Sequence, residues 1–386
     1  MIAQIINLAP PEVFKYYMSK YSANDNRYSF GFYGLELRDL RSSEREILNE
    51  GLSEIGELFY QSKNQDSIFL LGSIRKFKAV ANRLSNKSPA GISLKLFNTI
   101  NFFESYELTN YTIKNKLFEF KNAYVMGVLN VTPDSFSDGG KYLEKKDAVK
   151  HALRLLDEGA DIIDIGGESS RPGAENVDTE TELDRIIPVV IDVLHERPDT
   201  IISVDTTKEE ISRQALEAGA QIINDISGGT YEPQIMKRIA EHDATYIIMH
   251  MKGTPRDMQE HPSYENIVEE VYDFLYKQIK KATAEGIPNI FVDPGIGFGK
   301  RVDDNFNLLN RLDDFKSLSH PIVVGVSRKS FIRKTLGLNI EESDLPTSMM
   351  ESYSLSKGAR IIRTHNVKNG VMLRELFNRS NNVTVE

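Results

Sequence analysis

From residue 124 onward, the chain alternates short apolar runs with longer amphipathic stretches. Each run is rich in β-branched and aliphatic residues, and each is followed by a cluster of glycine or polar residues. Short apolar runs of this kind are typical of strands that are buried on both faces of a parallel sheet. The eight runs are YVMGVLN (124–130), DIIDIG (161–166), IISVD (201–205), QIIND (221–225), TYIIMH (245–250), NIFVD (289–293), PIVVGV (321–326) and RIIRTH (360–365).

The stretches between these runs have helical periodicity. Two examples are KKDAVKHALRLLDEG (145–159) and YENIVEEVYDFLYKQIKKATAEG (264–286), and the second ends in a glycine suited to a helix C-cap. Eight buried strands that alternate with helices predict an α/β fold of the (β/α)8 barrel class, also called a TIM barrel. The alternative is an open, doubly wound sheet, which eight regular repeats favour less.

The first part of the chain has a different pattern. An alternating stretch (28–37) and the run SIFLL (67–71) predict strands, and amphipathic segments that begin at Ser43, at Ile74 and after Gly91 predict helices. We therefore expect a small α/β accessory domain over residues 1–118 and the barrel over residues 119–386. The accessory part contains no histidine and no glycine-rich phosphate loop. We favour a structural cap or dimerisation module for it; a regulatory or partner-binding module is the alternative.

The composition narrows the class of protein. With 386 residues, 40% hydrophobic and 27% charged, the chain is neither wholly disordered nor collagen-like. Its 47 basic and 56 acidic residues give a net charge of −9, so no broad basic surface is expected to bind nucleic acid. The absence of cysteine excludes disulfides and thiolate chemistry. No apolar run is long enough to cross a bilayer, and the first residues lack the cationic region of a signal peptide, so we expect a cytoplasmic protein.

Polar residues follow most of the apolar runs at their C-terminal ends. In (β/α)8 barrels the catalytic groups occupy this end of the strands. A single Asp or Asn at a strand end often only caps the next turn or helix, but several at one rim favour a site. The residues at these run ends are Asn130, Asp205, Asn224, Asp225, His250, Asp293, Arg363 and His365.

Three of these residues suit a planar polar heterocycle. Asp205, Asn224 and Asp293 combine acceptors with an amide donor, and a carboxylate also stabilises positive charge that develops on a ring. Phe298, in the string DPGIGFGK (293–300), is expected to supply flat apolar contacts together with Met251 and Ile226. The alternative for these apolar residues is plain packing at the rim.

A second group of residues suits an anion. Gly325 and Ser327 lead through Arg328, Lys329 and Ser330 into a predicted helix. The loops after the first two runs, at 132–140 and 167–174, add further polar groups. We expect a phosphate or pyrophosphate site in which Asn130 gives one ligand to Mg²⁺. Its other candidate residues are Arg363, His365, Asp134, Ser170 and Arg171. Lys252 and Lys300 are interpreted as solvated or positioning groups.

Eight strings, in this order, resemble the dihydropteroate synthase family over about residues 122–378. They are MGVLNVTPDSFSDGG, DIGGESSRPGA, SVDT, NDISGG, MHMKGTP, DPGIGFGK, VGVSRKSFI and IIRTHNV, and each falls on a predicted strand-to-helix junction. The resemblance implies a (β/α)8 transferase of folate biosynthesis that is a sulfonamide target and usually a homodimer. Its reaction joins 6-hydroxymethyl-7,8-dihydropterin pyrophosphate to 4-aminobenzoate, giving 7,8-dihydropteroate and pyrophosphate.

The resemblance also implies residue roles. Asp205, Asn224, Asp293 and Lys329 would hold the pterin, and Asn130 would bind Mg²⁺ beside the pyrophosphate. Arg363 and His365 would hold the pyrophosphate with Asn130, and Phe136, Ser170, Arg171 and Ser330 would lie around the 4-aminobenzoate. The family mechanism is dissociative: a pterin cation forms first, and the arylamine then attacks it.

The chain departs from the family pattern at two places. Position 170 is Ser where the family commonly has Thr, and the segment 344–359 lacks the small residues usual before the last helix. Two other functions stay open. A pterin-binding methyltransferase that serves a corrinoid protein needs no pyrophosphate site, so the complete SRKS, RTH and TPDSFSDGG elements argue against it. A non-catalytic pterin-binding paralogue is the third reading, and a lost ligand residue would support it.

Overall fold

The protein divides into two compact units. The computed structural model describes residues 1–23, 33–54, 56, 59–85, 90–106, 109–131, 141–168 and 177–382. Unit 1 consists of Met1–Tyr106 together with Asp313–Ser319, and unit 2 consists of Glu107–Leu312 and His320–Glu386. Each unit has its own hydrophobic core.

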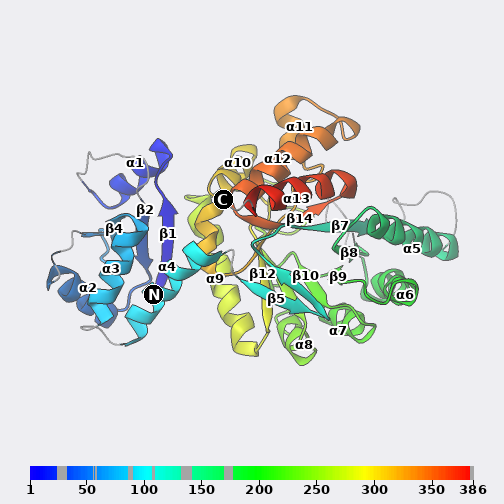
Figure 1. The fold of residues 1–386 in the computed structure, drawn as a ribbon, viewed down its shortest axis with the longest axis horizontal. Helices are drawn as coiled ribbons and strands as arrows, with labels where there is room; N and C mark the ends of the chain where they lie inside the picture. Colours follow the sequence, from blue (N-terminus) through cyan, green and yellow to red (C-terminus); the bar gives the residue numbers. More distant parts are fainter. Residues whose placement is uncertain are drawn as a thin grey trace. The chain divides into compact units, whose positions relative to one another are not determined.

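Unit 2 contains a closed barrel of eight parallel strands in the order β10-β11-β12-β13-β14-β7-β8-β9 (Figure 1). The strands are β7 (Tyr124–Asn130), β8 (Ile162–Gly166), β9 (Ile202–Asp205), β10 (Ile222–Asp225), β11 (Thr245–Met249), β12 (Asn289–Asp293), β13 (Ile322–Val324) and β14 (Ala359–Thr364). Each strand lies within one of the predicted apolar runs or within one residue of it. The predicted (β/α)8 barrel class is therefore confirmed, and the open sheet is wrong.

Helices follow the barrel strands in sequence. They are α5 (Lys141–Asp157), α6 (Thr179–Glu196), α7 (Glu209–Glu217), α8 (Ile235–Glu241), α9 (Ile267–Glu285), α10 (Val302–Asn310), α11 (Ser330–Leu336), α12 (Asp344–Ser356) and α13 (Val367–Asn381), with short 3-10 turns η3 (Leu312–Leu318) and η4 (Glu341–Ser343). The side chain of Asn266 caps α9 by accepting from the Val268 and Glu269 N–H groups, and Gly286 ends the helix at φ 90°. The glycine C-cap expected for this helix is thus confirmed.

Strand β13 is shorter than its apolar run. The register of its pairing with β14 shifts between Ile322 and Val323, and the strand ends at Val324. The chain then turns, because the Lys329 N–H donates to the Val326 carbonyl. The second half of the predicted run therefore forms the approach to α11 and does not extend the strand.

An antiparallel hairpin closes the N-terminal end of the barrel. Its strands are β5 (Asn110–Ile113) and β6 (Lys116–Glu119). Ile113, Phe118 and Phe120 pack against one layer of residues that point into the barrel. That layer contains Met126, Ile162, Ile201, Ile222, Ile247, Phe291, Val323 and Ile361. The sequence pattern predicts an accessory domain up to residue 118, whereas this hairpin lies in unit 2, because its apolar side chains complete the barrel core.

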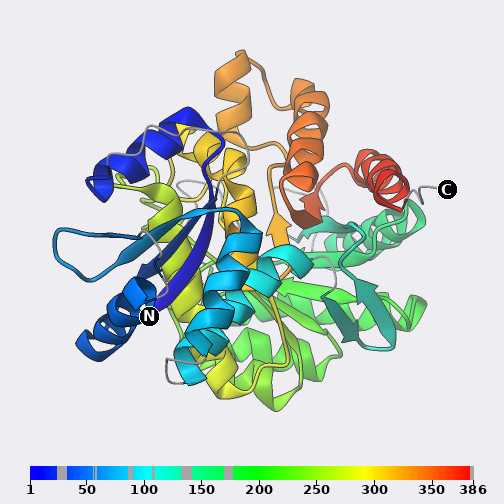
Figure 2. The same cartoon turned by 60° about the vertical axis from the view of Figure 1, so that its left-hand side comes forward.

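Unit 1 is a small α/β unit built on a four-stranded antiparallel sheet in the order β1-β2-β4-β3 (Figure 2). Its elements are β1 (Ile2–Asn7), α1 (Pro11–Lys20), β2 (Tyr33–Arg38), α2 (Ser42–Glu54), β3 (Phe59–Gln61), β4 (Ile68–Gly72), α3 (Ile74–Ser85) and α4 (Ala90–Ser105). The sequence pattern predicts β2, β4, α2, α3 and α4, whereas the strand Ile2–Asn7 and the helix Pro11–Lys20 are not among the predicted elements.

The sheet of unit 1 is covered on both faces. One face carries Ile5, Leu35 and Leu70, which share a core cluster with helices α2, α3 and α4. On the other face, Phe69 stacks against Tyr17 and Tyr21, with ring centroids 5.3 and 5.0 Å apart. The segment 313–319 belongs to this unit because it accepts hydrogen bonds from β1; the Ile5 N–H donates to Ser317 Oγ at 3.0 Å, and the Asn7 N–H donates to Asp314 Oδ1 at 2.9 Å.

Within the described ranges, no helix has the length and apolar character needed to traverse a bilayer.

Candidate active site

Four residues at the C-terminal ends of neighbouring strands form one row across the barrel rim. Asn130 of β7 pairs with Gly166 of β8, Gly166 pairs with Asp205 of β9, and Asp205 pairs with Asn224 of β10. Paired residues in a parallel sheet share a face, so the Asn130, Asp205 and Asn224 side chains lie side by side. Gly166 leaves the space between them open: a Cβ there would lie 3.6 Å from Asp205 Cβ and 3.8 Å from Asn130 Oδ1.

Arg363 of β14 joins this row to a buried carboxylate. Its Nε donates to Asp164 Oδ2 at 2.6 Å, and its Nη2 donates to Asp205 Oδ2 at 2.8 Å. Asn224 Nδ2 also donates to Asp164 Oδ2, at 3.1 Å. Asp164 therefore fixes the orientation of both Arg363 and Asn224.

Asp164 is not among the predicted site residues, because it lies in the middle of an apolar run and not at its end. The signal was nevertheless present: a carboxylate within the isoleucine-rich run DIIDIG cannot be buried without a partner. Its other oxygen, Oδ1, is buried and has no hydrogen-bond partner among the residues that the structure describes.

Burial changes the charge of the rim acids. Burial raises the pKa of Asp205 to about 7; Arg363 opposes this shift, while Asp164 adds to it. Burial raises the pKa of Asp293 to about 6, against the hydrogen bond from the Gly295 N–H and the charge of Lys329. Because both carboxyl groups titrate near neutral pH, a bound heterocycle can share a proton with them.

The cations of the rim are also affected. Burial lowers the pKa of Lys329 to about 8, and nearby Arg363 adds to this effect, while Asp293 and Asp205 oppose it. Burial also disfavours the charged form of Arg363, but the negative charges of Asp164 and Asp205 have the larger effect and raise the pKa of Arg363. Arg363 is thus a fixed positive charge, whereas the charge of Lys329 depends on its neighbours.

An apolar floor lies beside these charges. Ile226, Met249, Met258 and Phe298 form one buried cluster, and Met251 packs against it. Lys329 Nζ lies 3.8 Å from the centroid of the Phe298 ring. The structure therefore brings the three predicted apolar residues, Ile226, Met251 and Phe298, into one cluster, and the predicted Lys329 lies against Phe298.

The segment before α11 contacts the end of β14. The His365 N–H donates to Ser327 Oγ at 3.2 Å, and His365 Nδ1 lies 3.0 Å from the same hydroxyl. A Cβ on Gly325 would lie 3.8 Å from Arg363 Cβ, which places these two strand ends in van der Waals range. Lys329 is the N-cap residue of α11, and Ser330 is its first residue. Lys329, Arg363 and His365 are thus gathered at adjacent strand ends, as an anion site requires.

Four of the predicted residues lie outside the described part of the chain. They are Asp134 and Phe136 in the loop after β7, and Ser170 and Arg171 in the loop after β8.

Lys300 is a positioning group and not a solvated one. It is 2% exposed, and its Nζ donates to the Phe298 carbonyl at 2.9 Å and lies 3.0 Å from His250 Nδ1. Burial lowers its pKa to about 7, although Asp293 opposes the shift. Lys300 therefore fixes the loop that carries Phe298 against the end of β11.

Asp225 is an acid at a strand end that holds a turn and does not form part of the binding site. Its carboxylate accepts from the Ser227 N–H and hydroxyl, the Gly229 N–H and the Tyr246 hydroxyl, each at 2.7 Å. These four donors satisfy both of its oxygens, so Asp225 holds a turn and offers little to a substrate.

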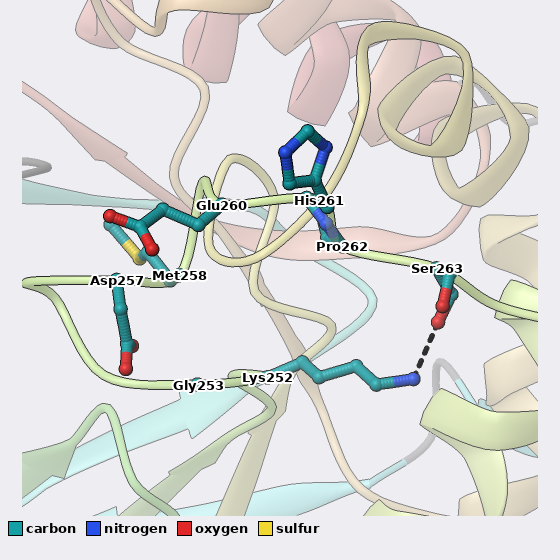
Figure 3. Close-up of a pocket in the computed structure, with 8 residues that line it drawn as sticks. All are labelled: Lys252, Gly253, Asp257, Met258, Glu260, His261, Pro262 and Ser263. Carbon is teal, nitrogen blue, oxygen red and sulfur yellow. Dashed lines mark hydrogen bonds between the residues drawn. The ribbon is translucent and has the colours of Figure 1, made fainter.

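A pocket of about 300 Å³ lies in the β11–α9 loop (Figure 3). It is lined by Lys252, Gly253, Asp257, Met258, Glu260, His261, Pro262 and Ser263. Lys252 Nζ donates to the Ser263 carbonyl at 2.5 Å and lies 4.3 Å from the Tyr264 ring centroid. None of the lining residues belongs to the row at the rim, and only Met258 is shared with the apolar floor. This pocket is therefore distinct from the charged site.

These features define a class: a (β/α)8 enzyme whose acids, amide and cations meet at the C-terminal rim of the barrel. The profile of the pterin binding enzyme family matches residues 126–365. The Streptococcus pyogenes dihydropteroate synthase is 44% identical over 251 residues, which cover 64% of this chain and 91% of that protein. The Escherichia coli dihydropteroate synthase is 44% identical over 255 residues, which cover 66% and 90%.

Solved structures agree with this match. The Yersinia pestis dihydropteroate synthase, solved with a sulfonamide drug complex, has a TM-score of 0.67 and 37% identity, and the match covers 71% of this chain and all of that chain. The Xanthomonas albilineans dihydropteroate synthase, solved with 4-aminobenzoic acid, has a TM-score of 0.66 and 37% identity, covering 71% and 99%. The chain belongs to the pterin binding enzyme family and, within it, to the dihydropteroate synthases of folate biosynthesis, with an N-terminal extension before the matched region.

Proposed function

We propose that the rim site itself carries out the dihydropteroate synthase reaction, with the pterin held deep in the barrel and the pyrophosphate held by the cations of β14 and the α11 approach. The observation that carries this assignment is the hydrogen-bonded row in which Arg363 bridges Asp164 and Asp205 while Asn224 shares Asp164. Arg363 thereby lies between the acidic residues proposed to bind the pterin and His365, which is proposed to bind the pyrophosphate.

The acids and amide bind the pterin in this assignment. Asn224 and Asp293 are 5% and 6% exposed, so a hydrogen bond from a pterin N–H to either is formed away from bulk water. The pterin has several N–H donors on one edge, and Asp205 and Asp293 accept them without a full charge when protonated. The Phe298 and Met251 side chains supply the apolar face against the ring.

The cations hold the leaving pyrophosphate. When the bond between the pterin methylene carbon and its oxygen breaks, the electron pair leaves with pyrophosphate, and Arg363 and Lys329 disperse its charge. The Asp205 and Asp293 carboxylates stabilise the pterin cation that remains. The arylamine nitrogen then attacks that carbon and releases a proton, so the reaction needs no strong base and no covalent nucleophile. The Xanthomonas albilineans relative binds 4-aminobenzoic acid, which supports the choice of arylamine.

Magnesium fits the chemistry of the residues present. Within the described ranges, no group of three or more acidic, histidine or cysteine side chains is arranged to hold a metal. Asn130 Oδ1 lies at the rim beside Gly166 and offers a single neutral oxygen. Mg²⁺ commonly takes one or two protein oxygens and fills its other positions with phosphate oxygens and water. Asn130 would hold the ion against the pyrophosphate, where the ion neutralises charge on the leaving group.

We also assign a homodimer to this chain, with the second copy covering helices α11 to α13. Seven large apolar side chains of these helices and of the turn between α11 and α12 are 37% to 71% exposed. They are Leu336, Ile340, Leu345, Met349, Tyr353, Met372 and Leu376. Apolar exposure of this extent on adjacent helices is typical of a protein interface. Light scattering of the full chain is expected to give twice the chain mass, and a monomer at micromolar concentration would contradict the assignment.

The direct test of the catalytic site is product formation by the full chain. The protein is incubated with 6-hydroxymethyl-7,8-dihydropterin pyrophosphate, labelled 4-aminobenzoate and Mg²⁺, and dihydropteroate is measured. Asp205→Asn and Lys329→Ala are each expected to reduce kcat/KM by about 100-fold or more while the circular dichroism spectrum is unchanged. The matched controls are Asp243→Asn and Lys277→Ala, which change exposed side chains of the same types. Wild-type turnover in the folded Asp205→Asn protein would refute the assignment.

A further inference from the structure

The loop 293–300, between β12 and α10, contains three glycines in left-handed conformations. They are Gly295, Gly297 and Gly299, with φ values of 70°, 86° and 62°. Glycine has more conformational freedom than any other residue, so a loop of this composition needs contacts from outside to adopt one shape. The loop carries Phe298, which belongs to the apolar floor, and its shape therefore affects the proposed pterin site.

Gly297 is the part of this loop that lies against Lys329. A Cβ added to Gly297 would lie 2.9 Å from Lys329 Cδ, which is closer than van der Waals contact. The next residue, Phe298, has its ring centroid 3.8 Å from Lys329 Nζ. Two consecutive residues of the loop therefore confine the lysine side chain, one at its aliphatic stem and one at its ammonium group. A displacement of Gly297 would change the position of both the ring and the charge.

Asn305 of α10 holds the backbone of Gly297. Its Oδ1 accepts from the Gly297 N–H at 2.6 Å, and its Nδ2 donates to the Arg301 carbonyl at 2.7 Å. Because Nδ2 is bonded at the start of its own helix, the side-chain amide has a fixed orientation, with the oxygen toward Gly297. Asn305 is 1% exposed, so water does not compete for these bonds.

The helix turn that carries Asn305 is itself well fixed. The Arg301 N–H donates to Asp304 Oδ2 at 2.9 Å, and the Arg301 side chain donates to both oxygens of the same carboxylate. These bonds hold the first turn of α10 by satisfying the backbone at its N-terminus. A side chain on such a turn is placed more precisely than a side chain on a loop. Asn305 therefore gives the glycine-rich loop a rigid reference point.

The other contacts of the loop come from the segment between β11 and α9. Gln259 Nε2 donates to the Gly297 carbonyl at 2.9 Å, and the Tyr264 hydroxyl donates to the Gly299 carbonyl at 2.7 Å. Gln259 is exposed, so water can replace its donor at little cost, whereas a bond to a buried amide such as that of Asn305 is not easily replaced. The position of Gly297 therefore depends mainly on Asn305.

We propose that Asn305 is a positioning residue for the pterin-binding part of the active site. Acting through the Gly297 backbone, it fixes the Phe298 ring against the Lys329 side chain. This inference rests on the proposed contact of Phe298 with the pterin ring. It adds that the alignment of this ring with the lysine depends on a neutral amide of the following helix.

The test compares two ligands in the full chain, so that positioning is separated from simple support of the fold. Calorimetry measures the affinity of 6-hydroxymethyl-7,8-dihydropterin and, with Mg²⁺, that of inorganic pyrophosphate. Asn305→Ala and Asn305→Leu are each expected to weaken the dihydropterin by about tenfold, because small misplacements of binding groups have large effects. Pyrophosphate is expected to weaken by no more than about threefold, since Arg363 and His365 lie on another strand end. Losses of equal size for the two ligands in a folded variant would overturn the inference.

A conservative variant, a double variant and a control sharpen the result. Asn305→Asp keeps an acceptor for the Gly297 N–H, so its loss of dihydropterin affinity is expected to be smaller than that of Asn305→Leu. Asn305→Leu combined with Phe298→Ala is expected to bind the dihydropterin no more weakly than Phe298→Ala alone, because the two residues act in series. Asn307→Ala is the matched control: Asn307 is exposed on the same helix, so neither affinity should change.

Phe298→Ala distinguishes failure of this inference from failure of the proposed pterin site. If folded Phe298→Ala binds the dihydropterin as the wild type does, the proposed contact fails, and the role of Asn305 fails with it. If Phe298→Ala weakens the dihydropterin but folded Asn305→Ala and Asn305→Leu do not, only the inference on Asn305 is overturned. Should neither Asn305 variant fold, Gly297→Ala takes their place, because its Cβ would displace Lys329. An unchanged dihydropterin affinity in Gly297→Ala then overturns the inference in the same way.

Discussion

The two ends of the barrel are built from the same eight strands but have opposite chemistry. At the C-terminal end, Arg363 donates to Asp205 and Asp164, and Asn224 donates to Asp164, so charges and an amide share one hydrogen-bonded network. At the N-terminal end, Phe118 and Phe120 of the β5–β6 hairpin pack on apolar side chains of the strands. The Phe120 and Phe291 rings lie edge to face with centroids 5.6 Å apart. Position along a strand therefore decides whether a buried side chain serves stability or chemistry.

The energetic difference between the ends explains this division. Burial of a large apolar side chain stabilises the fold by roughly 1.5–3 kcal/mol. Burial of a charged carboxyl group destabilises the fold, and the raised pKa values of Asp205 and Asp293 reflect this cost. The closed end thus supplies part of the stability that the charged end needs in order to keep acids and cations away from water.

The largest effect is expected at the closed end, on stability alone. Phe118→Ala removes a fully buried ring and is expected to lower the free energy of unfolding by about 3–5 kcal/mol. Urea denaturation followed by circular dichroism measures this change, and kcat/KM of the folded variant is expected to stay within about twofold of the wild type. The control is Leu117→Ala in the same strand, because Leu117 is 56% exposed. A large loss of kcat/KM in folded Phe118→Ala would show that the two ends are coupled.

Much of this contrast could be predicted from the sequence. The eight apolar runs gave the strands to within a few residues, because strands buried on both faces need continuous apolar residues. The polar residues after those runs marked the rim, since parallel strands place their C-terminal ends together. The pattern thus predicts Asp205, Asn224 and Arg363 at one rim, and in the structure they belong to one hydrogen-bonded network through Asp164.

The remaining features depend on contacts between segments that are distant in sequence. Asp164 lies inside a strand, and its importance depends on Arg363, which is 199 residues away. The β5–β6 hairpin has strands of four residues each, which are too short to give a clear alternating pattern. The partners of such residues are not set by a local pattern, although the place of Asp164 inside the apolar run DIIDIG indicates that it needs one.

An intermediate effect is expected at the charged end, in the pH dependence of stability. The pKa of Asp205 is about 7 in the folded protein and about 3.9 in the unfolded chain. Between pH 4 and 7 the folded state therefore holds a proton that the unfolded state releases, so the free energy of unfolding falls as the pH rises. One such group contributes at most about 1.4 kcal/mol per pH unit. Urea denaturation from pH 4.5 to 7.5 measures the slope.

Asp205→Asn is expected to make that slope less steep, because the amide does not titrate. The exposed control Asp243→Asn is expected to leave the slope unchanged. Asp293 contributes in the same direction up to about pH 6, so some fall with pH remains in the Asp205 variant. An identical slope in wild type and Asp205→Asn would mean that the charged end does not carry the energetic cost assigned to it here.

The smallest effect is expected for a single polar contact at the closed end. The Tyr111 hydroxyl of β5 donates to the Ile290 carbonyl at 2.9 Å and lies 3.1 Å from His320 Nδ1. Tyr111→Phe keeps the ring and removes this contact, so the free energy of unfolding is expected to fall by about 1 kcal/mol. Substrate KM values and kcat are expected to stay unchanged, as for Phe118→Ala. A change in the KM of either substrate without a change in stability would contradict the division between the two ends. It would mean that a contact at the N-terminal end of the barrel acts on substrate binding and not on stability.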